Sequence, residues 1–87
     1  MPRFMAVHTV PFAEEDLKKV AKDLPPQLPP DISWKLTYCG FADHKFFCDW
    51  EAPSKEALEQ IFKAQEMPFD AIYPVRLFDV AKLELEP

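Results

Sequence analysis

The chain has 87 residues, of which 48% are hydrophobic and 14% aromatic, and its formal net charge is −5. This length suits one domain, and an acidic chain lacks the basic face that nucleic acids and anionic membranes require. No apolar run approaches the roughly 20 residues of a membrane helix, and the N-terminus lacks the pattern of a signal peptide. We therefore expect one domain, residues 1–87, in a cytoplasmic protein without nucleic-acid or membrane partners.

The first two elements are a strand and an amphipathic helix. Residues 4–11 are rich in strand-favouring side chains and include His8. Residues 14–24 predict a helix, because their apolar side chains recur at helical spacing and their acidic residues precede their lysines. The proline-rich residues 25–30 then end this helix and predict a stiff, extended connection.

Two strands joined by a tight turn follow. Residues 32–39 and 45–51 alternate apolar and polar side chains, and residues 40–44 connect them. If the apolar faces coincide, even-numbered residues oppose even-numbered ones and the loop has an odd length. The two cysteines, Cys39 and Cys48, then lie on opposite faces of the sheet and remain free thiols.

The last third of the chain predicts a helix, a strand and a tail. Ser54 is a good N-cap for a helix that ends near Pro68. Residues 71–78 predict a fourth strand, and Pro74 places it at a sheet edge because proline cannot donate to a ladder. Residues 79–87 form a tail that is either a short extra strand or loose.

The order of these elements is β-α-β-β-α-β, which is typical of the ferredoxin-like α+β sandwich. We expect a four-stranded antiparallel sheet with both helices on one face and the first and third strands in the centre. The other face carries apolar groups, Phe47 among them, which are too many for an isolated small domain to leave in water. A homodimer with an association of the dimeric α/β-barrel type is therefore expected.

Short motifs along residues 1–75 carry a family resemblance. They are a first strand with His8, then Phe47-Cys48 followed by Glu51-Ala52-Pro53, then Glu56-Ala57, and finally Pro68-x-Asp70-x-Ile72-Tyr73-x-Val75. With these motifs the chain resembles a family of small bacterial ferredoxin-like proteins of uncharacterised function that includes a nickel-binding protein. The resemblance implies a homodimer with a ferredoxin-like sandwich and, in some members, bound metal. The metal-binding branch carries histidines in an Ala-His-Gly setting of its second helix, where this chain has Ala64-Gln65-Glu66.

The residues best suited to chemistry are His8 and Cys48. The first and third strands should be antiparallel neighbours, which brings both side chains to the same face if the pairing is not slipped by one residue. Imidazole and thiolate are ligands for nickel or zinc, and Glu51 is the candidate for a third ligand of the metal ion. The alternative is a small buried cysteine packed near a hydrogen-bonded core histidine.

Other polar and aromatic side chains allow two interpretations each. Asp49 and Glu51 form either cross-strand pairs with Lys35 or a ligand or base in a cleft between subunits. His44 is expected to be a solvated turn residue. A set of four aromatic side chains forms either a pocket for a small apolar ligand or part of the core or dimer interface. Its members are Trp34, Tyr38, Phe46 and Trp50.

Two function classes follow from these observations. The first is a small cytosolic homodimeric binding protein that holds a transition metal, nickel or zinc, or a small ligand through His8, Cys48 and Glu51. The second is a cofactor-independent dimeric α/β-barrel enzyme, of monooxygenase or isomerase type, with His8 or Glu51 as the general base for a small apolar substrate. The first is preferred, because the family resemblance supports it and no second acid or base partner is evident.

Overall fold

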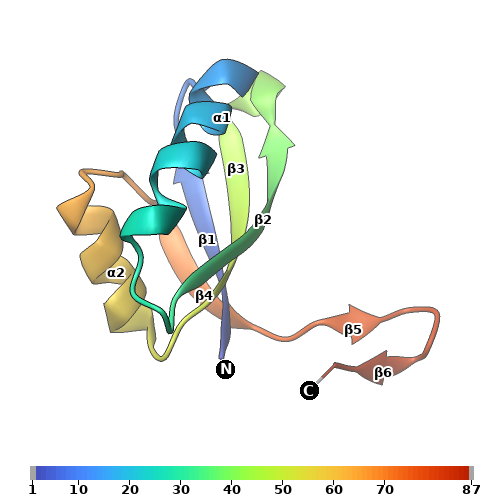
Figure 1. The fold of residues 1–87 in the computed structure, drawn as a ribbon. Helices are drawn as coiled ribbons and strands as arrows, with labels where there is room; N and C mark the ends of the chain where they lie inside the picture. The colour runs from blue at the N-terminus through green and yellow to red at the C-terminus, as the bar shows by residue number, and fades with distance from the viewer. Residues whose placement is uncertain (1, 87) are drawn as a thin grey trace.

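The computed structural model describes residues 2–86, which form a sheet, two helices packed on it and a C-terminal hairpin (Figure 1). The elements are β1 (Arg3–Thr9), α1 (Glu14–Asp23), β2 (Ser33–Gly40), β3 (Lys45–Glu51), α2 (Lys55–Ala64), β4 (Ala71–Val75), β5 (Phe78–Asp79) and β6 (Glu84–Leu85). The sheet order is β2-β3-β1-β4, and all neighbours are antiparallel. The α+β class, the four-stranded antiparallel sheet and the two helices are thus confirmed. Within residues 2–86, neither helix is long and apolar enough to cross a membrane.

A single apolar core lies between the helices and one face of the sheet. Buried side chains of β1 and β3 meet those of α2 there, and the partly buried Val20 of α1 packs against them. The largest fully buried side chains are Trp50, Leu58 and Phe62. We call this side of the sheet the helix face and the other side the open face. Because side chains alternate along a strand, even-numbered residues of β1, β3 and β4 lie on the helix face and odd-numbered ones on the open face.

The helix ends follow from local capping. The Ser54 side chain accepts a hydrogen bond from the backbone N–H of Ala57 at 3.2 Å, which confirms the predicted N-cap of α2. α1 begins after Ala13, whose backbone N–H donates to the Asp16 carboxylate at 2.8 Å. The connection after α1 is not purely extended as expected, because Pro25–Gln27 continue as one turn of 3-10 helix.

The register between β2 and β3 differs from the expected one. Cys39 pairs with Phe46, so that odd-numbered residues oppose even-numbered ones across a four-residue loop. This loop is a 3-10 turn that closes at His44 in the left-handed conformation. A β-bulge between Trp34 and Leu36 absorbs the shift, and Trp34 still opposes Trp50. Cys39 and Cys48 therefore share a face, which corrects the prediction of opposite faces; both are free thiols.

The fourth strand is shorter than predicted. β4 ends at Val75, and Phe78 already belongs to the hairpin of β5 and β6. Among the described strands β4 pairs with β1 alone, so Pro74 lies in an edge strand as predicted. The tail forms a short two-stranded hairpin that extends away from the rest of the molecule (Figure 1), and position 87 lies outside the described residues.

Candidate functional site

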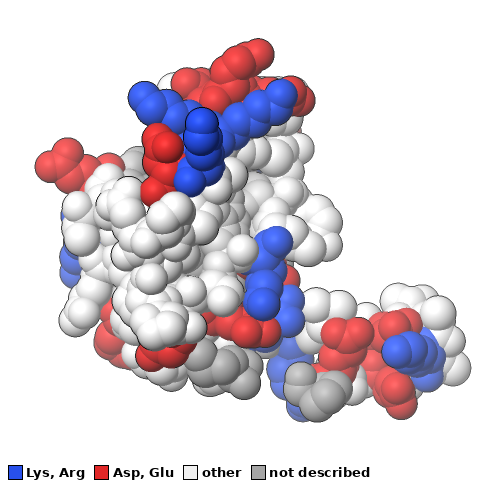
Figure 2. Space-filling model, in the orientation of Figure 1, with Lys and Arg blue, Asp and Glu red and all other residues white. Residues whose placement is uncertain are grey.

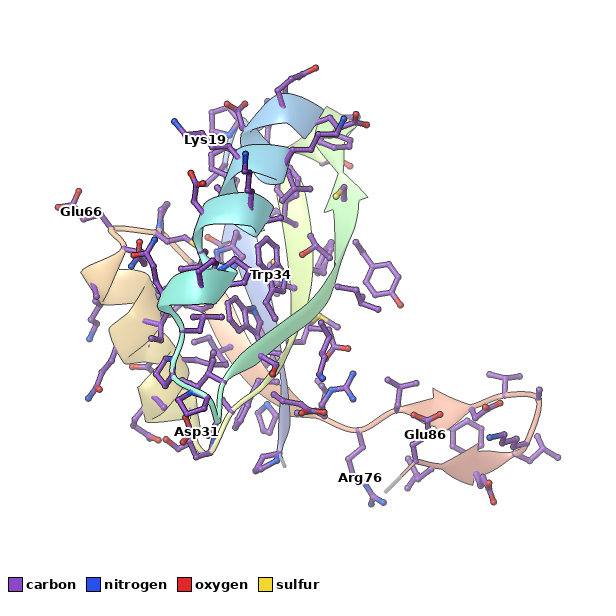
Figure 3. The ribbon with its side chains drawn as sticks, viewed as in Figure 1. Lys19, Asp31, Trp34, Glu66, Arg76 and Glu86 are labelled. Atoms are coloured by element: carbon purple, nitrogen blue, oxygen red, sulfur yellow. The ribbon has the colours of Figure 1, made fainter. Side chains whose placement is uncertain are left out.

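A pocket of about 370 Å³ lies between α1, the helix face of the sheet and the segment that follows α2. β1 contributes His8 and β3 contributes Cys48 and Trp50, while apolar side chains of α1 cover one side. Trp34 lies between α1 and the sheet, and Glu66 points outward beyond the end of α2 (Figure 3). The lining is largely apolar, as is usual for sites that hold small organic molecules.

His8 is buried and held in one orientation. Its Nδ1 lies 2.8 Å from the carbonyl oxygen of Pro68, and its ring packs edge-on against Phe62 with centroids 5.1 Å apart. A carbonyl oxygen can only accept, so Nδ1 carries the proton and Nε2 of the neutral ring is an acceptor. Burial lowers the pKa of His8, although the bond to Pro68 opposes this shift. The neutral ring is therefore the form present near neutral pH.

Two nitrogen atoms in the pocket lining are buried without a partner. Nε2 of His8 and Nε1 of Trp50 have no hydrogen-bond partner among residues 2–86. Trp34 stacks on Trp50 with a centroid distance of 5.7 Å and an interplanar angle of 10°. In contrast to Trp50, Trp34 donates its own N–H to the hydroxyl of Thr37 at 2.8 Å. The pocket lining thus includes one side chain with a buried, unpaired acceptor and one with a buried, unpaired donor.

Cys48 lies on the same face as His8, as predicted, because Ala6 pairs with Cys48 and His8 pairs with Phe46. The thiol is buried and accepts a hydrogen bond from the Thr37 hydroxyl at 3.2 Å. Burial raises the pKa of Cys48 to about 11, an effect that the bond from Thr37 only partly offsets. Cys48 is therefore protonated at neutral pH and is a poor nucleophile and a poor metal ligand.

Glu51 does not join His8 and Cys48. It lies on the open face, where its carboxylate is 3.8 Å from the guanidinium of Arg3 and 3.7 Å from the ammonium of Lys35. The predicted cross-strand pair with Lys35 is thus present for Glu51. The expectation that Glu51 completes a metal shell with the other two residues is not met by this geometry.

Asp49 is the buried charged residue of β3, and it pairs with Arg3 rather than with Lys35. Both of its carboxylate oxygens accept hydrogen bonds from the guanidinium, one of them at 3.0 Å. Its side chain is 6% exposed although it lies on the open face. A carboxylate in this environment requires such a partner, so the pair serves stability rather than chemistry.

The donor set does not fit a nickel or zinc centre. Such sites use three or four converging ligands. Within residues 2–86 no group of three or more histidine, cysteine, aspartate or glutamate side chains could hold a metal ion. Only His8 and Cys48 of the three predicted ligands share a face, and burial keeps the thiol protonated.

Of the predicted aromatic group, Trp34, Phe46 and Trp50 line the pocket, whereas Tyr38 is exposed on the open face. His44 is exposed in its turn, as expected. The sequence interpretation missed Thr37, which bonds to both Trp34 and Cys48. In a regular strand Thr37 and Trp34 would lie on opposite faces of the sheet. The bulge moves Thr37 to the helix face, and no feature of the residues themselves predicts that bulge.

Comparison with known proteins identifies the family. Residues 4–75 match the model of a family described as "Nickel responsive protein SCO4226-like". The crystal structure of SCO4226 from Streptomyces coelicolor A3(2) matches with a TM-score of 0.73 and 23% identity, covering 86% of this chain and 96% of that one. No curated protein matches the chain. The family match spans most of the chain and ends just before the C-terminal hairpin, so the protein belongs to the SCO4226-like family of nickel-responsive proteins.

Proposed function

We propose that this protein is a small cytosolic homodimer of ferredoxin-like fold that binds a small, largely apolar ligand in the pocket. The observation that carries the proposal is the pair of unpartnered buried nitrogen atoms, on His8 and Trp50, in an otherwise apolar lining. The volume of about 370 Å³ is at the low end of the range for ligand sites and suits a small molecule. The free thiols fit a reducing compartment.

The two nitrogen atoms define the polar part of the ligand. A buried donor or acceptor without a partner costs about 1–3 kcal/mol, and a ligand that supplies the partner recovers part of this cost. Nε2 of His8 requires a donor, and Nε1 of Trp50 requires an acceptor. A hydroxyl group can donate to Nε2 or accept from Nε1, so we infer an apolar ligand with a hydroxyl or a similar donor–acceptor group.

Phenol and toluene form a matched pair of probes for this proposal, because they share an aromatic body and differ in the hydroxyl group. We expect calorimetric titration to show phenol binding at least tenfold more tightly than toluene, which corresponds to about 1.4 kcal/mol. His8→Phe should remove this preference, whereas His44→Gln, outside the pocket, should retain it. Equal affinity for both probes, or a preference that survives His8→Phe, would contradict the proposal.

Nickel or zinc binding stays a prediction for this chain. The family description links its members to nickel, but the pocket side of the sheet offers only His8 and Cys48 as ligands from the predicted set. If these two residues do bind the ion, His8→Ala and Cys48→Ser should each lower the affinity at least tenfold in calorimetry. Affinity that neither substitution changes would place the metal elsewhere, and no binding to the unaltered protein at millimolar nickel would end the metal hypothesis.

One observation favours the alternative of a cofactor-independent dimeric α/β-barrel enzyme. A neutral histidine with a free Nε2 in an apolar pocket has the protonation state of a general base. In this alternative the protein is an enzyme of monooxygenase or isomerase type, and Nε2 takes a proton from its small apolar substrate. A His8→Asn variant would then keep the bond to Pro68 through its amide and lose turnover, whereas a pure binding protein shows no turnover in either form.

A further inference from the structure

The C-terminal hairpin, residues 77–86, lies beyond the family match and has its own internal structure. Phe78 pairs with Leu85 and Asp79 with Glu84, and the ladder extends to a bond of 2.8 Å from the N–H of Glu86 to the carbonyl of Leu77. The turn is fixed by the Asp79 carboxylate, which accepts from the N–H of Lys82 at 3.0 Å. The hairpin is thus an ordered unit rather than a loose tail.

The hairpin is amphipathic and its apolar residues are in water. The Phe78–Leu85 pair lies on one face and the Asp79–Glu84 pair on the other. Phe78 is 53% exposed and Val80 and Leu83 are each 77% exposed. An isolated two-stranded hairpin is at best marginally stable, because it has no core to pack against. Its apolar side chains therefore require a surface to cover them.

The open face of the sheet is the apolar surface in the same chain that lacks a cover. Leu36, Tyr38, Phe47 and Tyr73 are each between 39% and 62% exposed there, and they come from three of the four strands. The salt-bridge network of Arg3, Asp49, Glu51 and Lys35 lies on the same face. Figure 2, which views the molecule from the helix side, shows charged groups over α1 and along the hairpin.

The exposed area of the single chain is larger than that of a typical monomer. The chain exposes 5967 Å², whereas a compact monomer of 10.1 kDa exposes about 5,300 Å². Its radius of gyration is 13.4 Å, against about 12 Å for a compact domain of this length. The excess of about 700 Å² is close to the roughly 800 Å² that one partner buries in a standard protein interface. The shape of the chain therefore suits a subunit of an assembly.

The base of the hairpin lies beside the start of β1, and its tip points away from the sheet (Figure 1). Pro2, Arg3, Arg76, Leu77 and Glu86 line one shallow pocket at this base. Figure 3 shows Arg76 on the linker and Glu86 at the base, and Figure 1 shows the hairpin extending outward from the end of β4. A hairpin in this position leaves the open face of its own chain uncovered.

We propose that the C-terminal hairpin packs its apolar face, centred on Phe78 and Leu85, on the open sheet face of a second copy of this chain. Two-fold symmetry makes the contact reciprocal, so that each hairpin covers the open face of its partner and both unpartnered surfaces are buried together. This inference rests on the homodimer of the proposed function and names the segment that holds it together. The hairpin lies outside the matched family region, the open face lies within it, and the contact is independent of the pocket.

Sedimentation velocity over a concentration series tests the proposal on the full chain and on a chain that ends at Val75. We expect the full chain to dimerise at micromolar concentration and the shortened chain to bind its partner at least 100-fold more weakly, about 2.8 kcal/mol. Phe78→Asp should have a similar effect without removing backbone, while Lys82→Ala on the turn should have none. Far-UV circular dichroism shows whether each variant folds.

Three outcomes would overturn the proposal, and they are distinguishable. If the full and shortened chains dimerise equally, the homodimer stands and the hairpin has no part in it. If both are monomers at 100 µM, the homodimer itself is wrong. Replacing Phe78 with the photo-crosslinker p-benzoylphenylalanine separates the remaining case: we expect covalent dimers with attachment near Tyr38, Phe47 or Tyr73. Attachment to these residues within one chain alone would show that the hairpin covers its own sheet.

Discussion

The two faces of the sheet differ in how their apolar side chains are covered. On the helix face, Trp50 and Phe62 are fully buried and the remaining space is a pocket whose lining carries two unpaired polar atoms. On the open face, Tyr38 and Tyr73 are more than half exposed and polar groups are paired in salt bridges. We propose that a ligand fills the remaining space on the helix face and that a second copy of the chain covers the open face.

Truncating one aromatic side chain on each face should give the largest contrast. Trp50→Ala removes a fully buried indole and should lower the free energy of unfolding by about 3–5 kcal/mol, because a large cavity remains. Tyr38→Ala should change it by no more than about 0.5 kcal/mol at concentrations where the chain is monomeric. Urea denaturation measures both. If Tyr38→Ala lowered the free energy of unfolding as much as Trp50→Ala, the two faces would not differ in how well their aromatic side chains are covered.

The Arg3–Asp49 pair is the strongest polar interaction of the open face. Asp49→Ala should lower the free energy of unfolding by about 1.5–3 kcal/mol, because a doubly bonded, nearly buried carboxylate is lost and Arg3 is left with weaker partners. Glu51→Ala is the matched control on the same strand. The ion pairs of Glu51 are long and partly exposed to water. Glu51→Ala should therefore lower the free energy of unfolding by less than about 1 kcal/mol. Equal effects in urea denaturation would contradict this ranking.

His8 makes the stability of the helix face depend on pH. Its pKa is lowered in the folded protein, so below about 6.5 the unfolded chain binds a proton that the folded chain does not. Stability is therefore fully present above this pH and should fall as the pH drops toward the folded pKa, by at most about 1.4 kcal/mol per pH unit. His8→Asn should abolish this slope and His44→Gln should not. A pH dependence of stability that remains in the His8→Asn variant would show that other groups cause it.

The two cysteines should differ in reactivity, which is the smallest of these effects. Cys39 is exposed, whereas Cys48 is buried with its pKa raised to about 11. Iodoacetamide at pH 8 should therefore label Cys39 in the folded protein and reach Cys48 only after unfolding. Mass spectrometry of tryptic peptides identifies the labelled residue. Labelling of both thiols at similar rates would show that the pocket opens readily to solvent.

Much of this fold could be predicted from the sequence because β1 and β3 follow a period of two. The right-handed crossovers of the β-α-β-β-α-β order predict β1 and β3 in the centre, and Pro74 agrees with an outer position of β4. The bulge between Trp34 and Leu36 could not be predicted, since it depends on how the loop at His44 closes. The C-terminal hairpin showed only a weak alternation, because its strands are two residues long.

The candidate site was predictable in part. His8 and Cys48 share a face because β1 and β3 pair without a slip, and this was expected. Glu51 lies three residues after Cys48 in the same strand, so alternation alone already placed it on the other face, in conflict with a shared metal shell. The bond from His8 to Pro68 joins residues far apart in the chain and involves a backbone carbonyl, which leaves no signal in side-chain chemistry.

The most direct test of the ligand pocket is the state of the His8 imidazole, observed by long-range ¹H–¹⁵N NMR on labelled protein at pH 7. The account predicts a neutral ring with the proton on Nδ1, as the bond to Pro68 requires, and an Nε2 signal that moves when phenol is added but not when toluene is added. A charged ring, a proton on Nε2, or an Nε2 signal that ignores phenol would contradict it.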